Sequence, residues 1–344
     1  MKLEANGNAV VGLVAFEFQP HLSKNFCKVV VLLSFLFFVS GIRSSYGFGV
    51  GFYDFSCLAA EFIVRSTVRS AASNDETIPG KLLRLLFHDC FVEGCDASVL
   101  LEGKGTEKDD PANASLGGFE VIESAKREIE IFCPETVSCA DILAMAARDA
   151  VALTGGPDIQ IPTGRRDRMV SAVSNVRPNI VDTSFKVDEM MKSFGSKGLS
   201  LEDIVILSGS HTIGSAHCSA FNDRFQINSK GNMTFVDPTL DKAYALNLAK
   251  KCSKTASAMV SIDPQTSLAF DNQYYVNLIA HRGLFQSDST LFADQRTRNI
   301  VEQFANDMNS FYEGWSQSFI KMSSIGVKTD GGGEVRQTCS RING

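Results

Sequence analysis

The chain has 344 residues, enough for one large hydrophobic core or for two lobes on either side of a crevice. Its 33 basic residues are outnumbered by 39 acidic ones, which gives a formal net charge of −6. This acidic balance argues against a surface that binds nucleic acid or another polyanion.

The start of the chain has the pattern of a targeting segment. Lys24 and Lys28 precede an apolar run over residues 29–39, and small residues follow as far as Gly47. This order predicts a secretory signal over residues 1–47 with a cleavage site near Gly47. Because the run is short for a membrane span, an uncleaved signal anchor is the weaker alternative.

Signal cleavage leaves residues 48–344, which we expect to form a single domain without membrane attachment. Residues 1–23 are longer than a signal needs. They are either an extended n-region or the product of an upstream start, and the sequence does not distinguish the two.

The pattern after the signal is mainly helical. Apolar residues recur at helical spacing, Pro79 opens the second helix, and Gly and Pro at 155–157 close the fourth. Strand signals are few: residues 159–161 and a small hairpin around Gly231. A polar loop spans about 102–118. We expect helices over 57–72, 79–91, 119–132, 138–153, 186–195, 200–209, 240–251, 271–281, 297–308 and 311–324, and hence an all-α protein with long loops.

An arginine and a histidine lie four residues apart near the end of the helix expected over 79–91. On a helix, Arg84 and His88 therefore share one face. A charged arginine among Leu82, Leu85 and Leu86 is costly unless it has a partner or a role. The pair is a candidate site, and the alternative is decoration on the surface of an amphipathic helix.

A second histidine ends the helix expected over 200–209. Ser200 is a suitable N-cap, and His211 follows the last turn, where it could simply cap the helix. A metal cofactor held by His211 on one side and faced by Arg84 and His88 on the other would explain both segments.

Eight cysteines lie beyond the signal, while Cys27 lies within it. An even number in an exported chain predicts a disulfide framework, although composition does not decide which cysteines pair. Zinc sites are disfavoured, because the chain has no Cys-x-x-Cys. For Cys90 and Cys95 a local disulfide, with Asp89 and Asp96 merely solvated, is the simplest interpretation.

Five motifs point to one family. They read Arg-Leu-Leu-Phe-His-Asp-Cys-Phe-Val-Glu-Gly-Cys-Asp-Ala-Ser, Val-Ser-Cys-Ala-Asp-Ile-Leu, Gly-Arg-Arg-Asp, Leu-Ser-Gly-Ser-His-Thr-Ile-Gly and Phe-Asp-Asn-Gln-Tyr-Tyr. Over roughly residues 50–342 the chain resembles the plant secretory (class III) haem peroxidases, the family of horseradish peroxidase. The resemblance implies a mainly α haem-peroxidase fold, with a distal and a proximal helical lobe, one haem b between them and minor short strands.

The resemblance also implies roles for the two histidine segments. His211 matches the axial ligand of the haem iron, and Asp288 matches the carboxylate that accepts its other ring N–H. His88 matches the general base that moves a proton between the oxygens of hydrogen peroxide. Arg84 matches the group that stabilises the developing negative charge. Phe87 matches the aromatic residue packed over the haem.

In the family an Asn holds the ring of the general base, and a Glu supports that Asn. Asn113 and Glu107 are the candidates, but the loop from Glu107 to Phe119 is one residue shorter than in horseradish peroxidase. Asn113 also begins an Asn-x-Ser glycosylation sequon. We favour the catalytic role for Asn113 and take Asn232 as the possible glycan site.

Two calcium sites are implied by the same matching, and oxygen ligands in short loops suit this ion. The alternative is that the acids belong to ordinary solvated loops. The first site would use Asp89, Val92, Gly94, Asp96 and Ser98. The second would use Thr212, Asp263, Thr266, Ala269 and Asp271.

Further pairings follow from the resemblance. Asp141 and Arg165 match a buried ion pair, and Val181 falls where the family lines its aromatic-donor site. The implied disulfides are Cys57–Cys133, Cys90–Cys95, Cys139–Cys339 and Cys218–Cys252.

The expected function is that of a secreted, monomeric haem peroxidase of the apoplast or cell wall. It would use hydrogen peroxide to oxidise small phenolic donors in one-electron steps, in lignin or phenol oxidation, peroxide removal or the oxidative stress response. The alternative from another class is a catalytically silent extracellular scaffold or wall-binding protein. An intracellular ascorbate-type peroxidase is opposed by the signal and the eight cysteines.

Overall fold

Helices dominate the described part of the chain. The computed structural model describes residues 47–344 apart from 229–232, 254–257 and 330, and residues 47–344 make one compact unit. The described residues hold eleven α-helices and four short strands, which confirms the mainly α prediction. Almost all of the expected signal, and the possible glycan site Asn232, lie outside the described residues. No described helix combines the length and the apolar character that a membrane crossing requires.

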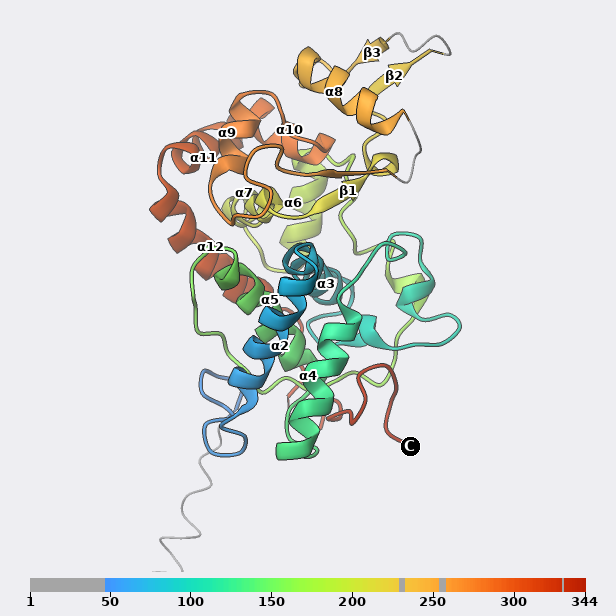
Figure 1. Cartoon of the computed structure of the whole chain (residues 1–344), viewed down its shortest axis with the longest axis vertical. Coiled ribbons are helices and arrows are strands. Elements are labelled where there is room, and N and C mark those ends of the chain that lie inside the picture. The colour runs from blue at the N-terminus through green and yellow to red at the C-terminus, as the bar shows by residue number, and fades with distance from the viewer. Residues whose placement is uncertain (1–46, 229–232, 254–257, 330) are drawn as a thin grey trace, which may run out of the picture. The chain divides into compact units, whose positions relative to one another are not determined.

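One group of helices forms around α5, which packs against α2, α3 and α4 (Figure 1). The central helix α5 has a well-defined start, because the Ser138 hydroxyl accepts a hydrogen bond from the Asp141 N–H and so caps the helix. The members are α2 (Ala60–Asn74), α3 (Ile78–Val92), α4 (Phe119–Phe132) and α5 (Cys139–Leu153).

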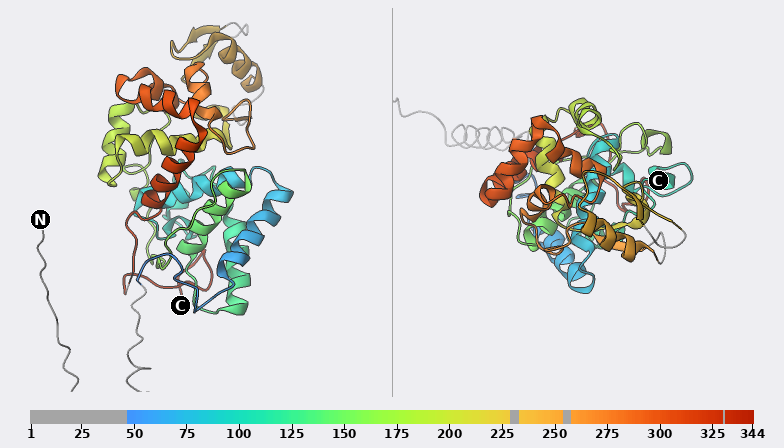
Figure 2. Two further views of the ribbon diagram at one scale, coloured as in Figure 1. Left: turned by 90° about the vertical axis from the view of Figure 1, so that its left-hand side faces the viewer. Right: turned by 90° about the horizontal axis from the view of Figure 1, so that it is seen from above.

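A second group lies above the first in Figure 1 and is also separate in the left-hand view of Figure 2. It contains α6 (Val187–Ser196), α7 (Leu201–Ser208), α9 (Gln273–Ile279), α10 (Gln286–Ala293) and α11 (Gln295–Asn306). The last helix, α12 (Met308–Met322), packs against α7 and α11 and leads the chain back toward the first group. These are the two helical lobes that the resemblance implies.

The strands form two small antiparallel pairs. In the first, β1 (Ser215–His217) pairs with β4 (Met259–Ser261). In the second, β2 (Phe225–Ile227) pairs with β3 (Met233–Val236) and packs with α8 (Lys242–Cys252). The second pair confirms the expected hairpin, although Gly231 itself lies outside the described residues.

The strand expected at residues 159–161 is wrong. Those residues join no strand, and the nearest backbone pairing among the described residues is an isolated bridge between Thr163 and Gly49. Ile161 is apolar because it is buried in the core, not because it lies in a sheet. Pro162 follows directly, and its missing N–H limits any ladder there.

Four disulfides brace the described chain: Cys57–Cys133, Cys90–Cys95, Cys139–Cys339 and Cys218–Cys252. They are the pairs that the family resemblance implies. The bridge between Cys90 and Cys95 closes the turn that follows α3, and the one between Cys139 and Cys339 ties the start of α5 to the C-terminal segment.

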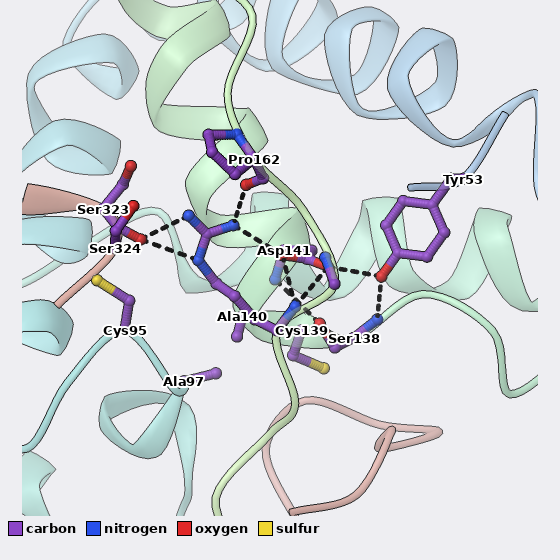
Figure 3. A network of polar contacts seen from close by, with 12 residues as sticks. Tyr53, Cys95, Ala97, Ser138, Cys139, Ala140, Asp141, Pro162, Ser323 and Ser324 are labelled. Carbon is purple, nitrogen blue, oxygen red and sulfur yellow. Dashed lines mark hydrogen bonds and ion pairs between the residues drawn. The ribbon is translucent and has the colours of Figure 1, made fainter. Parts of the chain in front are cut away.

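A buried ion pair joins three distant segments (Figure 3). Arg165 Nη1 lies 2.8 Å from Asp141 Oδ1, and both side chains are fully buried. The Tyr53 hydroxyl donates to the other Asp141 oxygen at 2.6 Å. Arg165 also donates through Nε to the Ser323 carbonyl at 3.0 Å. Hydrogen-bonded polar groups thus hold together the segment before α2, the start of α5 and the end of α12.

Candidate active site

The first half of the site lies on α3. The leucines of this helix are buried in the core, whereas Arg84 is exposed. His88 is only 4% exposed. The two side chains are one helical turn apart, as the sequence predicts. Phe87 is half-buried, and its ring centre lies 5.6 Å from that of His88 and 4.3 Å from that of Phe91.

The ring of His88 is held by an amide. His88 Nδ1 lies 2.7 Å from Asn113 Oδ1, and Asn113 Nδ2 donates to the Glu107 carbonyl at 2.9 Å. Because the Asn113 nitrogen faces a carbonyl, its oxygen faces the imidazole, and His88 Nδ1 is therefore the donor. The other ring nitrogen, Nε2, is left for a reacting partner. Asn113 is 5% exposed, a burial that does not suit a glycan.

The environment keeps His88 uncharged. Burial, together with the positive charge of Arg84, lowers the pKa of His88 to about 3, although the bond to Asn113 acts in the opposite direction. His88 is therefore a neutral imidazole near neutral pH, which is the form that a proton acceptor needs.

The guanidinium of Arg84 is held by the same loop. Its Nη1 donates to the Ser115 hydroxyl at 2.9 Å and to the Ser115 carbonyl at 3.2 Å, and its Nη2 donates to the Ala112 carbonyl at 3.1 Å. Residues 112–115 thus hold both Arg84 and His88. No spacing in the sequence predicted the Ser115 contact, and Ser115 was notable only as the last residue of the glycosylation sequon.

Glu107 supports Asn113 through its backbone carbonyl, which accepts from Asn113 Nδ2. Its carboxylate is buried, and neither oxygen has a hydrogen-bond partner among the described residues. Burial and the nearby charge of Asp96 raise the pKa of Glu107 to about 7.

The second half of the site follows α7 in a short 3-10 turn, Gly209–Thr212. The Ser200 and Asp203 side chains cap the start of α7 reciprocally and so fix the helix that leads to His211. His211 Nδ1 lies 2.8 Å from Asp288 Oδ1, and the carboxylate makes Nδ1 the donor. Nε2 of His211 is then the nitrogen left for a metal.

Asp288 receives two further hydrogen bonds. The Phe285 N–H donates to its Oδ2 at 2.9 Å, at the start of α10. The Tyr274 hydroxyl donates at 2.9 Å to Oδ1, the oxygen that also receives the His211 N–H. Burial and the charge of Asp288 raise the pKa of Tyr274 well above its ordinary value. Tyr274 was missed at the sequence level, where it was only part of a family motif.

The ring of His211 sits among aromatic side chains but is 38% exposed. Its centre lies 5.3 Å from that of Phe285 and 6.1 Å from that of Tyr274. A partly open imidazole with one nitrogen fixed by a buried carboxylate suits a metal ligand better than a helix cap.

The loop after α3 gathers the first expected calcium set. Asp89, Asp96 and Ser98 are fully buried. Asp96 Oδ2 and Ser98 Oγ have no hydrogen-bond partner among the described residues. Burial, followed by the charge of Asp96, raises the pKa of Asp89 well above its ordinary value. Two buried carboxylates beside an unpartnered hydroxyl suit a hard cation.

The backbone turns sharply at Gly94, whose φ is +124°. A Cβ on this residue would lie 2.8 Å from the Gly326 carbonyl oxygen. Only glycine fits at position 94. It allows the backbone at Val92 and Gly94 to turn into the loop that carries Asp96. Lys328 Nζ lies 3.4 Å from Asp96 Oδ2 and compensates part of its charge.

The second expected calcium set also comes together. Thr212 Oγ1 lies 2.9 Å from Asp271 Oδ1 and 3.5 Å from the Ala269 carbonyl oxygen. Thr266 Oγ1 lies 3.1 Å from the same Asp271 oxygen and 3.3 Å from Asp263 Oδ2. Each of the two sets has two carboxylates and otherwise hydroxyls and carbonyls. No group of three or more His, Cys, Asp or Glu side chains in the described ranges could hold a metal ion.

The expected donor position, Val181, is half-buried and packs against the main core.

Comparisons with known proteins agree with this geometry. A family model described as "Peroxidase" matches residues 64–307. The chain is 59% identical over 315 residues to Peroxidase 46 of Arabidopsis thaliana, covering 91% of this chain and 97% of that protein. It is 60% identical over 295 residues to Peroxidase 18 of the same plant, covering 85% and 90%. Peroxidase 66 is 45% identical over 299 residues, covering 85% and 91%.

Proposed function

We infer the reaction from the family of the chain, which belongs to the plant class III peroxidases. Membership makes the protein a peroxidase, with hydrogen peroxide as substrate and a haem cofactor. Its disulfides and relatives point to the secretory pathway. We propose, more specifically, a secreted monomer with one haem b and two calcium ions that oxidises small phenolic donors.

One observation carries the proposal: the two site histidines are fixed in the same way for different roles. Each has its Nδ1 engaged by a buried acceptor, at 2.7 Å for His88 and 2.8 Å for His211. Each therefore presents Nε2. The acceptor of His88 is a neutral amide, while that of His211 is a carboxylate, which increases electron donation by a metal-bound imidazole.

The residues present fit a haem. His211 would hold the iron, and Phe87 with Arg84 would lie over the opposite face. The partial exposure of His211 and the exposed Arg84 side chain leave both accessible to a bound group. When bound, the haem supplies the redox chemistry: it gives two electrons to peroxide and recovers them one at a time from the donor.

The residues of the chain supply proton transfer and charge stabilisation. His88 Nε2 takes a proton from one peroxide oxygen and returns it to the other, which leaves as water. Arg84, held by the loop at 112–115, faces the negative charge that develops as the O–O bond breaks. Over a full cycle one peroxide and two phenols give two waters and two phenoxyl radicals, so electrons and protons balance.

The two calcium sets would brace the two histidine segments. The set of Asp89, Asp96 and Ser98 begins directly after His88, and Thr212 of the other set follows His211. A cation at each place would satisfy the buried oxygens and fix the end of the element that carries the histidine.

We further propose the apoplast or cell wall as the place of action, in lignin or phenol oxidation or in peroxide removal under oxidative stress. Val181 is proposed to line the donor site. The acidic charge of the chain does not favour a wall-binding scaffold that relies on polyanion binding.

The test uses the secreted, haem-loaded protein. We expect a haem Soret band, peroxide-dependent oxidation of guaiacol, and loss of about 99% or more of that activity in His88→Ala, because general acid–base catalysis contributes at least about 100-fold. His281→Asn is the matched control, because His281 is exposed and has a positive φ that Asn tolerates. A colourless protein, or full activity in His88→Ala, would refute the proposal. Turnover on a panel of phenols and ascorbate would then define the donor, and N-terminal sequencing would locate the signal cleavage.

A further inference from the structure

One oxygen atom of Asp288 accepts hydrogen bonds from two side chains. Asp288 Oδ1 accepts from His211 Nδ1 at 2.8 Å and from the Tyr274 hydroxyl at 2.9 Å, while Oδ2 accepts from the Phe285 N–H. The backbone donor is fixed by the start of α10. The tyrosine is the only one of the three that a substitution removes without altering the backbone or the expected iron ligand.

We propose that Tyr274 is a positioning residue that limits, through Asp288, how strongly His211 donates electrons to a bound metal. This inference rests on the proposed role of His211 as the iron ligand. A hydrogen bond from the phenol stabilises the negative charge on Asp288 Oδ1. The same oxygen then attracts the His211 proton less strongly, so the imidazole keeps more of that proton and has less imidazolate character.

The surroundings make this sharing effective. Tyr274 is 3% exposed and Asp288 is 1% exposed, so water does not easily take the place of the phenol. Inside a protein the low dielectric strengthens hydrogen bonds and makes linked bonds depend on one another. The ring of Tyr274 is also fixed, because it packs edge-on against Tyr275 with ring centres 5.1 Å apart.

The next residue provides a matched control. Tyr275 lies on the same helix, α9, and is also fully buried. Its hydroxyl donates to the Val205 and Ile206 carbonyls of α7 at 3.1 and 3.3 Å, and not to Asp288. Tyr275→Phe therefore removes the same atom from the same helix, and leaves the carboxylate untouched.

The experiment compares the Fe³⁺/Fe²⁺ midpoint potential of haem-loaded wild type, Tyr274→Phe and Tyr275→Phe. We expect Tyr274→Phe to favour the ferric form. At the wild-type midpoint potential, the ferric-to-ferrous ratio of this variant should be about threefold to tenfold higher than that of the wild type. At about 59 mV per decade, this corresponds to a midpoint potential that is lower by about 28 to 59 mV. The iron–histidine stretching frequency of the ferrous protein should rise as well. Tyr275→Phe should leave both unchanged. Equal shifts in the two variants, or no shift in Tyr274→Phe, would overturn the inference.

A second comparison shows whether the effect passes through Asp288. In an Asp288→Asn background, Tyr274→Phe should shift the potential by less than a third of its effect in the wild type. An undiminished shift would overturn the inference. Should Tyr274→Phe fail to fold, 3-fluorotyrosine at position 274 keeps the shape and donates more strongly, and it should move the potential in the opposite direction. An unchanged potential there would count against the proposal.

These outcomes are distinct from failure of the proposed function. If His211 were not the ligand, the wild type itself would lack the iron–histidine band. If only the role of Tyr274 were wrong, the wild type would show the band and react with peroxide, and the two tyrosine variants would behave alike.

Discussion

Replacing Asn113 by valine should slow the reaction with hydrogen peroxide by about 10- to 100-fold. When His88 accepts a proton, its Nδ1–H bond to Asn113, 2.7 Å long in the neutral state, becomes a bond from a charged donor. Such bonds contribute about 1.5–3 kcal/mol. At about 1.36 kcal/mol per tenfold change in rate, losing the bond slows the proton transfer by one to two orders of magnitude. Valine fills a similar volume but accepts nothing.

The pH dependence gives an independent check. The pKa of His88 is lowered to about 3 by burial and by Arg84, and Asn113 opposes that shift. The wild-type rate should therefore be flat above about pH 4 and fall as the pH drops through the pKa, because protonated His88 is no base. Asn113→Val removes a contact that raises the pKa, so its acid limb moves to lower pH. Asn113→Asp adds a carboxylate, which raises the pKa and moves the limb to higher pH.

Stopped-flow measurement of the Soret change under excess peroxide gives the rate directly. Both variants lose the glycosylation sequon, so a glycan effect would be common to them and cannot produce opposite pH shifts. Asn306→Val, at an exposed position on α11, is the control for the substitution itself. A rate within twofold of wild type in Asn113→Val would refute the reasoning, as would a glycan on Asn113 in the active enzyme.

Two further predictions concern stability. Chelating calcium should lower Tm by about 5–10 °C for each ion removed, since an ion at about 100 times its Kd contributes about 2.7 kcal/mol and each kcal/mol shifts Tm by roughly 2–4 °C in a large domain. In Ser98→Ala, which lacks one unpartnered buried oxygen, higher calcium should be needed to restore Tm; a Tm indifferent to chelation contradicts the site. Asp141→Asn leaves Arg165 buried with its charge uncompensated and should cost about 3–5 kcal/mol in urea unfolding, and a loss below about 1 kcal/mol would show that the pair matters little.

The sequence predicted those parts of the fold that depend on local signals. The helix expected over 119–132 is found at Phe119–Phe132, and the capping serines set the starts of α5 and α7. The helix α10 was missed because its eight residues have no apolar stripe; its start is fixed by a side-chain contact of Asp288 with the Phe285 N–H. The pair β1–β4 was missed because three-residue strands 44 positions apart leave no local pattern.

The residues of the candidate site likewise divide into those that local spacing predicts and those that it does not. Arg84 and His88 were recognisable as a pair because helical spacing alone puts them on one face. The contact between His211 and Asp288 spans 77 positions, so only the family resemblance suggested it. The Asn113 contact could not be decided from a shortened loop, because Asn113 aligns when counted from Glu107 but less clearly when counted from Phe119. The phenol of Tyr274 reaches Asp288 across two helices, and no spacing rule predicts such a contact.

The two histidines show why the acceptor's charge matters more than its position. The distances from Nδ1 to the acceptor are nearly equal, 2.7 and 2.8 Å. A neutral amide leaves His88 with a low pKa, which keeps it free to accept a proton. A carboxylate in its place would stabilise the imidazolium and so weaken the base at acid pH. At His211, the proposed iron ligand, the reverse would hold: an amide acceptor would make the imidazole a weaker electron donor. On the proposal made above, the Asp288 oxygen that also accepts from Tyr274 would set electron donation by His211 between that of an Asn acceptor and that of an Asp without the tyrosine.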